Sequence, residues 1–288
     1  MDTTAVGGFS VPSGGLVALP SGQRLWVHDT GDAPGSELPV VLLHGLGATA
    51  ALNWFAGMDA LARRRRVIAL DLPGHGRSPR RGRFRLEQVA EEVGQLLDEL
   101  GIEQCIVAGY SMGGVIAQLM ARQRPDLVRG LVLCATSRDF RGRPADRLRF
   151  GAITALAIGA RLVPLTPAQL VRPVARRQSG DRWRIAAELS NSSHLAICEA
   201  ADALGRFTSR TWLHELQLPA TVVLTTQDRL VPPNRQRKLA ESLPDARVIK
   251  LDGDHLAAGR LPVAFRAALL RAVTDVSGRA TRAGRTAA

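Results

Sequence analysis

Gly109-Tyr110-Ser111-Met112-Gly113 is the stretch that decides the fold, because it joins a predicted strand, Cys105–Ala108, to a predicted helix, Met112–Gln123. A serine on a sharp strand-to-helix turn of this kind has a strained backbone and an exposed hydroxyl. The residues two before and two after it must be very small, and both are glycine here. We therefore predict that Ser111 is a nucleophile, with the positive end of the helix dipole directed at the site.

His255 and Asp228, far C-terminal to Ser111, are candidates for the base and the acid that such a serine requires. A serine hydroxyl is a poor nucleophile unless an imidazole takes its proton, and a carboxylate must hold that imidazole in one tautomer. Asp228 follows the predicted strand Ala220–Thr225, and His255 follows the predicted strand Arg247–Leu251. Open α/β sheets place their sites at the carboxyl ends of strands. The sequence therefore predicts a triad of Ser111, His255 and Asp228.

A glycine-rich loop, His44-Gly45-Leu46-Gly47, follows the apolar run Pro39–Leu43. Acyl transfer needs two backbone N–H donors that converge on the oxyanion. We predict that the N–H groups of Leu46 and Met112 form this oxyanion hole. The His44 side chain is interpreted as a structural hydrogen-bonding group, because the loop must present N–H groups rather than an imidazole.

Strands and helices alternate over most of the chain, which predicts an α/β fold with a mostly parallel, doubly wound sheet. The alternation stops between Ser137 and Leu216, where no convincing strand appears and prolines interrupt the helical pieces. We predict an α/β core at residues 1–136 and 217–275, a helical cap (lid) at 137–216, and a disordered basic tail at 276–288. Further predicted strands lie at 16–19, 24–29, 67–70 and 131–135, and further helices at 51–62, 86–100, 234–243 and 263–273.

The composition is that of a globular protein: 288 residues, 45% hydrophobic and 22% charged. No apolar run approaches the roughly 18 residues of a membrane helix, and no secretory signal is visible. The formal charge of +12 comes from arginine, yet aromatic residues are 4% and no nucleic-acid-binding module appears. The three cysteines are widely spaced in apolar surroundings, which favours free thiols in a reducing compartment. We expect a cytoplasmic protein that has no nucleic-acid partner and no integral membrane segment.

Together these motifs resemble the α/β-hydrolase superfamily, from about Val40 to Arg271. The resemblance rests on 43–47 (LHGLG), 71–78 (DLPGHGRS), 109–114 (GYSMGG) and the pair Asp254-His255. It implies a capped serine hydrolase similar to esterases, enol-lactone hydrolases and carbon–carbon bond hydrolases, with haloperoxidase-like perhydrolases nearby. Serine at position 111 differs from the aspartate of the epoxide hydrolase and haloalkane dehalogenase branches, which argues against both.

The resemblance also bears on residues whose roles stay open. Some superfamily members take their acid from an earlier strand, which makes Asp139 a serious rival to Asp228. Asp252 and Asp254 compete less well, because they adjoin His255 in sequence and such neighbours usually point their side chains elsewhere. In relatives, a histidine at the place of His75 supports its loop, so we do not expect it to be catalytic.

The function predicted from the sequence is hydrolysis of a carboxylic ester or lactone of small size, through an acyl-enzyme and without cofactor or metal. Carbon–carbon bond cleavage and perhydrolysis on the same triad remain alternatives. A non-catalytic ligand receptor on this fold is a third alternative, although such receptors often lose a triad member. The substrate and the oligomeric state are not readable from the sequence.

Overall fold

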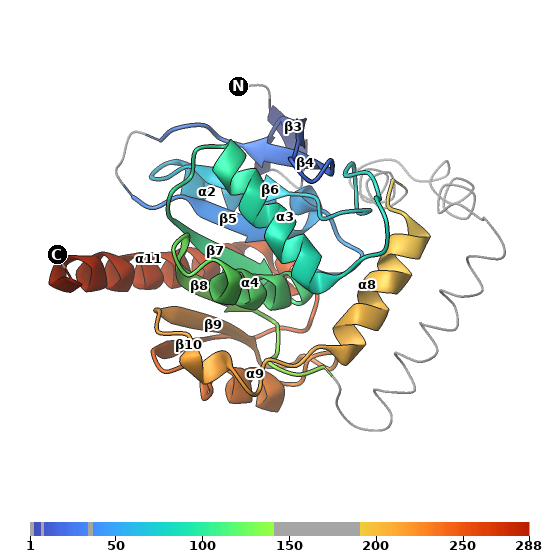
Figure 1. The fold of residues 1–288 in the computed structure, drawn as a ribbon. Helices are drawn as coiled ribbons and strands as arrows, with labels where there is room; N and C mark the ends of the chain where they lie inside the picture. Colours follow the sequence, from blue (N-terminus) through green and yellow to red (C-terminus); the bar gives the residue numbers. More distant parts are fainter. Residues whose placement is uncertain (1–2, 7–8, 34–36, 141–190, 288) are drawn as a thin grey trace.

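The structure, a computed structural model, describes residues 3–6, 9–33, 37–140 and 191–287 (Figure 1). Its strands are β1 (Thr3–Val6), β2 (Phe9–Pro12), β3 (Gly14–Ala18), β4 (Arg24–Asp29), β5 (Val40–Leu43), β6 (Val67–Leu70), β7 (Cys105–Tyr110), β8 (Val128–Cys134), β9 (Ala220–Thr225) and β10 (Ala246–Leu251). Within the described ranges, eight of them form one sheet in the order β10-β9-β8-β7-β5-β6-β4-β3, and β1 pairs with β2 separately.

The sheet is mostly parallel, as predicted. The strands from β10 to β6 are parallel to their neighbours, and β4 runs antiparallel to both β6 and β3. Because β5 lies between β6 and β7, the chain winds first to one side of β5 and then to the other. The carboxyl ends of β5 and β7 therefore meet at a topological switch point, where α/β sheets place their sites.

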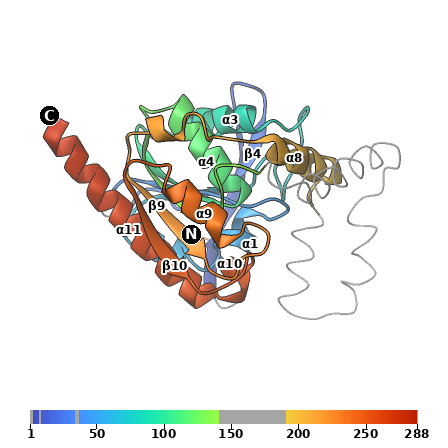
Figure 2. The same cartoon turned by 90° about the horizontal axis from the view of Figure 1, so that it is seen from below.

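Helices cover both faces of the sheet (Figure 2). They are α1 (Ala50–Trp54), α2 (Met58–Ala62), α3 (Leu86–Glu99), α4 (Met112–Gln123), α8 (His194–Arg206), the 3₁₀ turn η1 (Leu213–Glu215), α9 (Pro233–Ala240), α10 (Ala257–Arg260) and α11 (Pro262–Ala287). Apolar residues of α3, α4, α8 and α9 belong to one core cluster, and those of α1, α2, α10 and α11 to a second.

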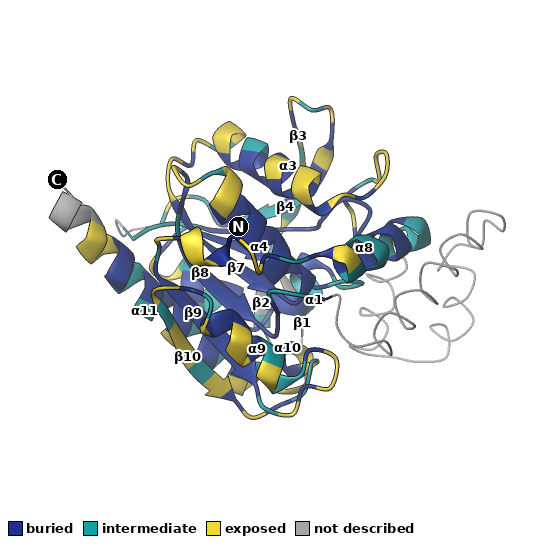
Figure 3. Ribbon diagram, turned by 60° about the horizontal axis from the view of Figure 1, so that its bottom comes forward, coloured by how far each residue is buried: buried dark blue, intermediate teal, exposed yellow. Residues whose placement is uncertain are grey.

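The strands β5 and β6 are apolar throughout because both of their faces are buried. In β5, Val41 and Leu43 belong to the cluster with α3 and α4, whereas Val40 and Leu42 belong to the cluster with α11. All four side chains are fully buried, and Figure 3 shows the same burial along the middle of the sheet. A continuous apolar run is the expected pattern for such a strand.

The predicted helix at 51–62 is two helices in the structure, α1 and α2. The chain turns between them, with the Gly57 N–H donating to the Trp54 carbonyl at 2.9 Å. A Cβ on Gly57 would lie 2.6 Å from the Leu269 side chain of α11. The close approach of α11 therefore favours a small residue at the break, and the period of the local sequence does not reveal it.

The C-terminal segment differs from the prediction of a disordered tail at 276–288. Helix α11 continues to Ala287. Val276 is fully buried, and the C-terminal end of α11 projects beyond the sheet in Figure 2. Arg279 pairs with Asp275 and Asp245, at 2.7 Å in each case. Burial of Val276 and these two ion pairs stabilise a helix that composition alone did not predict.

Most of the predicted cap, residues 141–190, lies outside the described residues. In the part that is described, α8 is tied to the loop before α3. The buried Glu199 carboxylate accepts hydrogen bonds from Arg80 at 3.1 Å and from the Phe84 N–H at 3.0 Å. Among the described helices, none combines the length and apolarity required to cross a membrane.

Candidate active site

Ser111 occupies a strained turn between β7 and α4. Its φ of 51° and ψ of −111° put a non-glycine residue at positive φ, which costs energy and is typical of functional sites. A Cβ on Gly109 would lie 2.3 Å from the Gly113 carbonyl oxygen, and one on Gly113 would lie 2.1 Å from that of Leu43. The turn is thus possible only with glycine at both positions, which is the reason for the G-x-S-x-G spacing.

His255 bridges Ser111 and Asp228. Its Nε2 lies 3.0 Å from Ser111 Oγ, and its Nδ1 lies 2.7 Å from Asp228 Oδ2. A neutral imidazole in this position donates from Nδ1 to the carboxylate and accepts the serine hydroxyl at Nε2, which is the tautomer that a general base requires. The structure therefore brings together the three side chains that the sequence predicted as a triad, from loops after β7, β9 and β10.

The Asp228 carboxylate is fully buried and is held by four donors besides His255. Its Oδ1 accepts the N–H groups of Leu230 and Val231 at 2.9 and 2.8 Å. Its Oδ2 accepts the Thr225 hydroxyl at 2.9 Å and the Gln236 amide at 3.3 Å. Hydrogen bonds of this kind compensate the charge for its lost hydration and fix the direction of the lone pairs that face His255.

The rival aspartates are directed at other partners. Asp139 pairs with Arg210 at 3.5 Å. Asp252 accepts the Thr226 hydroxyl at 2.7 Å, and Asp254 pairs with Arg260. In this geometry the carboxylate against the imidazole is that of Asp228.

The loop after β5 runs beside the serine. A Cβ on Gly45 would lie 3.4 Å from Ser111 Cβ, and the Gly45 N–H donates to Asn53 Oδ1 at 2.9 Å. With that N–H engaged, Leu46 is the next residue whose N–H can face a substrate. Met112 opens α4, so its N–H has no acceptor within the helix.

His44 and His75 lie beneath this loop as neutral, fully buried rings with centroids 5.2 Å apart. His44 Nε2 accepts the Leu72 N–H at 2.9 Å, which leaves its Nδ1 to donate to the Gly45 carbonyl at 2.8 Å. Burial lowers the pKa of His44 to about 4 and that of His75 to about 3. Both side chains therefore hold loops together rather than exchange protons near neutral pH.

Comparison with known proteins decides the family. The sequence profile of the alpha/beta hydrolase fold family matches residues 39–258, which is most of the chain. The chain is an α/β-hydrolase. Its sequence is similar to that of a putative carbamate hydrolase, RutD, of Pseudomonas savastanoi pv. phaseolicola, with 29% identity over 80% of this chain and 92% of the relative. The prediction of an enzyme of the α/β-hydrolase type is confirmed.

Solved structures share the fold of this α/β-hydrolase. A thermophilic esterase from Thermogutta terrifontis has a TM-score of 0.75 at 24% identity, and the match covers 92% of this chain and 99% of the esterase. The enol-lactonase from Burkholderia xenovorans LB400 has a TM-score of 0.74 at 24% identity, and the match covers 90% of this chain and 100% of the enol-lactonase. These likenesses establish the architecture, and the chemistry has to be argued from the site.

Among the residues that the sequence analysis missed, Asn53, Thr225 and Gln236 lie around the predicted triad. Gln236 offered a signal, since it lies on the face of α9 that also carries Leu239 and Ala240, and all three are buried. A polar residue on an apolar helix face must find partners. Its Nε2 lies 2.8 Å from Thr225 Oγ1 and 2.7 Å from the Val231 carbonyl.

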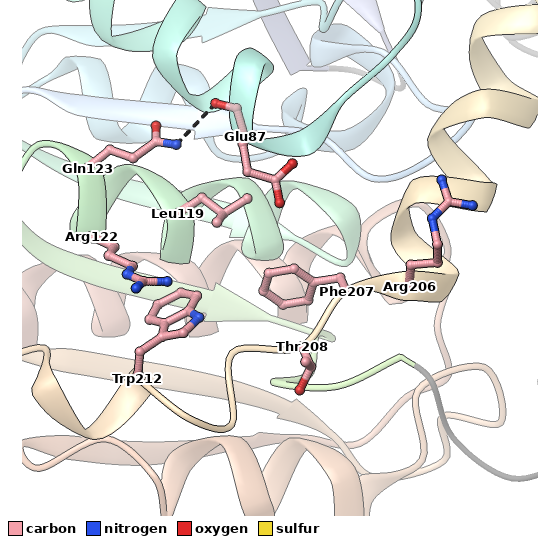
Figure 4. Close-up of a pocket in the computed structure, with 8 residues that line it drawn as sticks. All are labelled: Glu87, Leu119, Arg122, Gln123, Arg206, Phe207, Thr208 and Trp212. Carbon is pink, nitrogen blue, oxygen red and sulfur yellow. Dashed lines mark hydrogen bonds between the residues drawn. The ribbon is translucent and has the colours of Figure 1, made fainter.

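A cavity of about 480 Å³ lies farther along α4 (Figure 4). Its walls are Glu87, Leu119, Arg122, Gln123, Arg206, Phe207, Thr208 and Trp212. Leu119 is eight residues beyond Ser111, about 12 Å along a helix, so this cavity is separate from the triad. The Arg122 guanidinium is stacked on the Trp212 ring, 4.8 Å from its centroid, which closes one side of the cavity.

In the part of the chain that the structure describes, no cluster of three His, Cys, Asp or Glu side chains could hold a metal.

Proposed function

We propose that this α/β-hydrolase cleaves a small carboxylic ester or lactone through an acyl-enzyme formed on Ser111. The single observation that carries the proposal is the pair of contacts made by His255, at 3.0 Å to the serine oxygen and at 2.7 Å to the Asp228 carboxylate. A nucleophile, a base and an orienting acid within hydrogen-bond distance of one another are the arrangement that acyl transfer to serine requires.

In the first half-reaction, Ser111 Oγ attacks the carbonyl carbon as His255 Nε2 takes its proton. The imidazolium that forms is stabilised by Asp228, and the N–H groups of Leu46 and Met112 donate to the oxyanion. When the tetrahedral intermediate collapses, the imidazolium gives its proton to the departing alkoxide. A lactone follows the same path, except that its alcohol stays attached to the acyl group.

In the second half-reaction, water attacks the acyl-enzyme and His255 takes one of its protons. Collapse of this intermediate breaks the bond to Ser111 Oγ, releases the carboxylic acid and returns the proton to the serine. The oxyanion donors act in both halves, so no other group is required to stabilise the developing charge.

The substrate class is supported by the named relatives, which are a putative carbamate hydrolase, an esterase and an enol-lactonase. Carbamates, esters and enol-lactones all contain a carbonyl group that bears a heteroatom leaving group. We propose that residues 137–216 supply the substrate contacts, since the ion pair between Glu199 and Arg80 fixes the C-terminal part of this segment to the core.

We also propose that the enzyme works in the cytoplasm. In support of this, the thiols of Cys105, Cys134 and Cys198 are buried and form no disulfide.

The test is an activity screen beside active-site labelling. We expect p-nitrophenyl esters of short acyl chains or an enol-lactone to be turned over, and a fluorophosphonate to add one label, at Ser111. Ser111→Ala should abolish both while circular dichroism stays unchanged. A vinylogous diketone and an aryl carbamate complete the panel, because turnover of either one alone would replace the ester assignment. Labelling elsewhere, or full activity in Ser111→Ala, would overturn the chemistry.

A further inference from the structure

Tyr110 precedes Ser111 in the chain and also contacts His255. It is the last residue of β7 and is 4% exposed. Its hydroxyl donates to the backbone carbonyl of His255 at 2.8 Å. The two rings meet edge to face, with centroids 5.8 Å apart. One side chain thus connects the nucleophile turn with the backbone of the residue that carries the base.

The phenol is itself held rigidly. Its ring packs edge to face against Trp54 and Phe265, with centroid distances of 6.3 and 5.7 Å. Burial raises the pKa of the Tyr110 phenol far above its usual range, and a hydrogen bond with the backbone of Ala258 opposes that rise only in part. The hydroxyl therefore remains a protonated donor near neutral pH.

The loop that carries His255 faces solvent on its outer side. The next residue, Leu256, is 55% exposed, and Asp254 makes its ion pair with an exposed Arg260. The beginning of the loop is bound through the Gly253 carbonyl, which accepts the Gln227 N–H at 2.9 Å. At His255 itself, the bond from Tyr110 restrains the backbone from the protein interior.

We propose that Tyr110 is a positioning residue whose hydroxyl holds the backbone of His255 where its imidazole reaches both Ser111 and Asp228. This inference rests on the proposed function, because it assigns the residue that sets the geometry of that triad. Since Tyr110 and Ser111 are joined by one peptide bond, any shift of the turn moves the hydroxyl together with the serine. The distance between base and nucleophile is thereby maintained.

Tyr110→Phe removes the donor and keeps the ring, and it is the direct test. A misplacement of reacting groups by a fraction of an ångström to an ångström costs up to about 100-fold. We expect kcat and the rate of fluorophosphonate labelling to fall about 10- to 100-fold, with KM changed less than about twofold. The acidic limb of the pH–rate profile should move to lower pH, because an imidazolium held less firmly against Asp228 is less stabilised.

Two matched proteins separate positioning from packing. Phe265→Leu weakens the same aromatic cluster and leaves the hydrogen bond, so it should lower the melting temperature and keep the labelling rate and the acidic limb. Tyr110 is the one tyrosine of the sequence, so growth on 3-fluorotyrosine replaces only this residue. That protein keeps a hydroxyl donor and should show nearly wild-type kcat, as a rescue of the Phe variant.

Each outcome decides a different point. An unlabelled wild-type protein would overturn the proposed function and this inference with it. If the wild type is labelled and Tyr110→Phe has the same labelling rate and the same acidic limb, the role of Tyr110 alone is overturned. A loss of rate in Phe265→Leu equal to that in Tyr110→Phe would overturn it as well. If Tyr110→Phe does not fold, ¹⁹F NMR of the fluorotyrosine protein is the deciding measurement. Its resonance should titrate with the midpoint of the acidic limb, and a resonance that ignores this titration would refute the proposal.

Discussion

Thr225, the last residue of β9, donates its hydroxyl hydrogen to Asp228 Oδ2 at 2.9 Å. The same carboxylate oxygen faces His255, so the threonine and the imidazole restrain it together. Gln236 completes the arrangement by donating to the threonine oxygen at 2.8 Å. The direction of the carboxylate is therefore set by a strand and a helix that contribute nothing to the reaction directly.

Thr225→Val should lower kcat about tenfold, which corresponds to about 1.4 kcal/mol of lost transition-state stabilisation. Thr221→Val is the matched control, because Thr221 is equally buried in β9 and its hydroxyl donates to the Asp275 carboxylate at 2.7 Å. Both variants should lose about 1–2 kcal/mol in the free energy of unfolding. Steady-state kinetics beside urea titrations make the comparison, and equal kcat in the two variants would show that Thr225 acts only on stability.

Asp228→Asn should reduce kcat by about 10⁴, because the amide no longer fixes the tautomer of His255 or stabilises its cation. Asp139→Asn should leave kcat within about threefold, since Asp139 pairs with Arg210. Comparing kcat for the two variants on one active ester checks the assignment. The opposite ranking would move the orienting acid to the segment after β8.

The arrangement of the core could be predicted because its signals are local. The runs Val67–Leu70 and Ala220–Thr225 begin and end in the structure as predicted, since strands buried on both faces are rich in apolar and β-branched residues. The close packing at Gly57 and the helix beyond Val276 involve partners far along the chain, Leu269 and Asp245. No local pattern carries that information.

The candidate site divides in the same way. Ser111 and its glycines were predictable because a sharp turn imposes their spacing, and the order of strands located Asp228 and His255. Thr225 and Tyr110 were not predicted as part of the site, because their contacts arise only when distant segments pack. The catalytic roles of Ser111, His255 and Asp228, and the positioning roles of Thr225 and Tyr110, stay predictions that the experiments above test.

The buried histidines should make the protein less stable in weak acid. The folded-state pKa values of His44 and His75 are about 4 and 3, below the value of about 6.5 in an unfolded chain. Between these values the unfolded chain binds protons that the folded protein excludes, so stability present above pH 6.5 is lost as the pH falls. Linkage gives about 2 kcal/mol for each histidine at pH 5.

Urea unfolding of wild type and His75→Phe at pH 7 and pH 5 measures this effect. The loss of stability between the two pH values should be smaller in the variant by about 2 kcal/mol. His214→Phe is the control, because His214 is exposed in η1, and its pH dependence should equal that of wild type. Identical pH dependence in all three proteins would show that His75 does not take up a proton on unfolding.

The C-terminal helix should contribute to the stability of the core through Arg279. This guanidinium is 8% exposed and donates to Asp245, to Asp275 and to the Ala220 carbonyl at the start of β9, each at 2.7 Å. Arg279→Ala should lower the free energy of unfolding by about 2–3 kcal/mol, because it leaves carboxylates and a carbonyl without their donor. Arg282→Ala, an exposed position one turn farther on, should change it by less than about 0.5 kcal/mol. Chemical denaturation of the two variants decides the point. Equal stability would mean that the helix after Val276 adds nothing to the fold, as a disordered tail would.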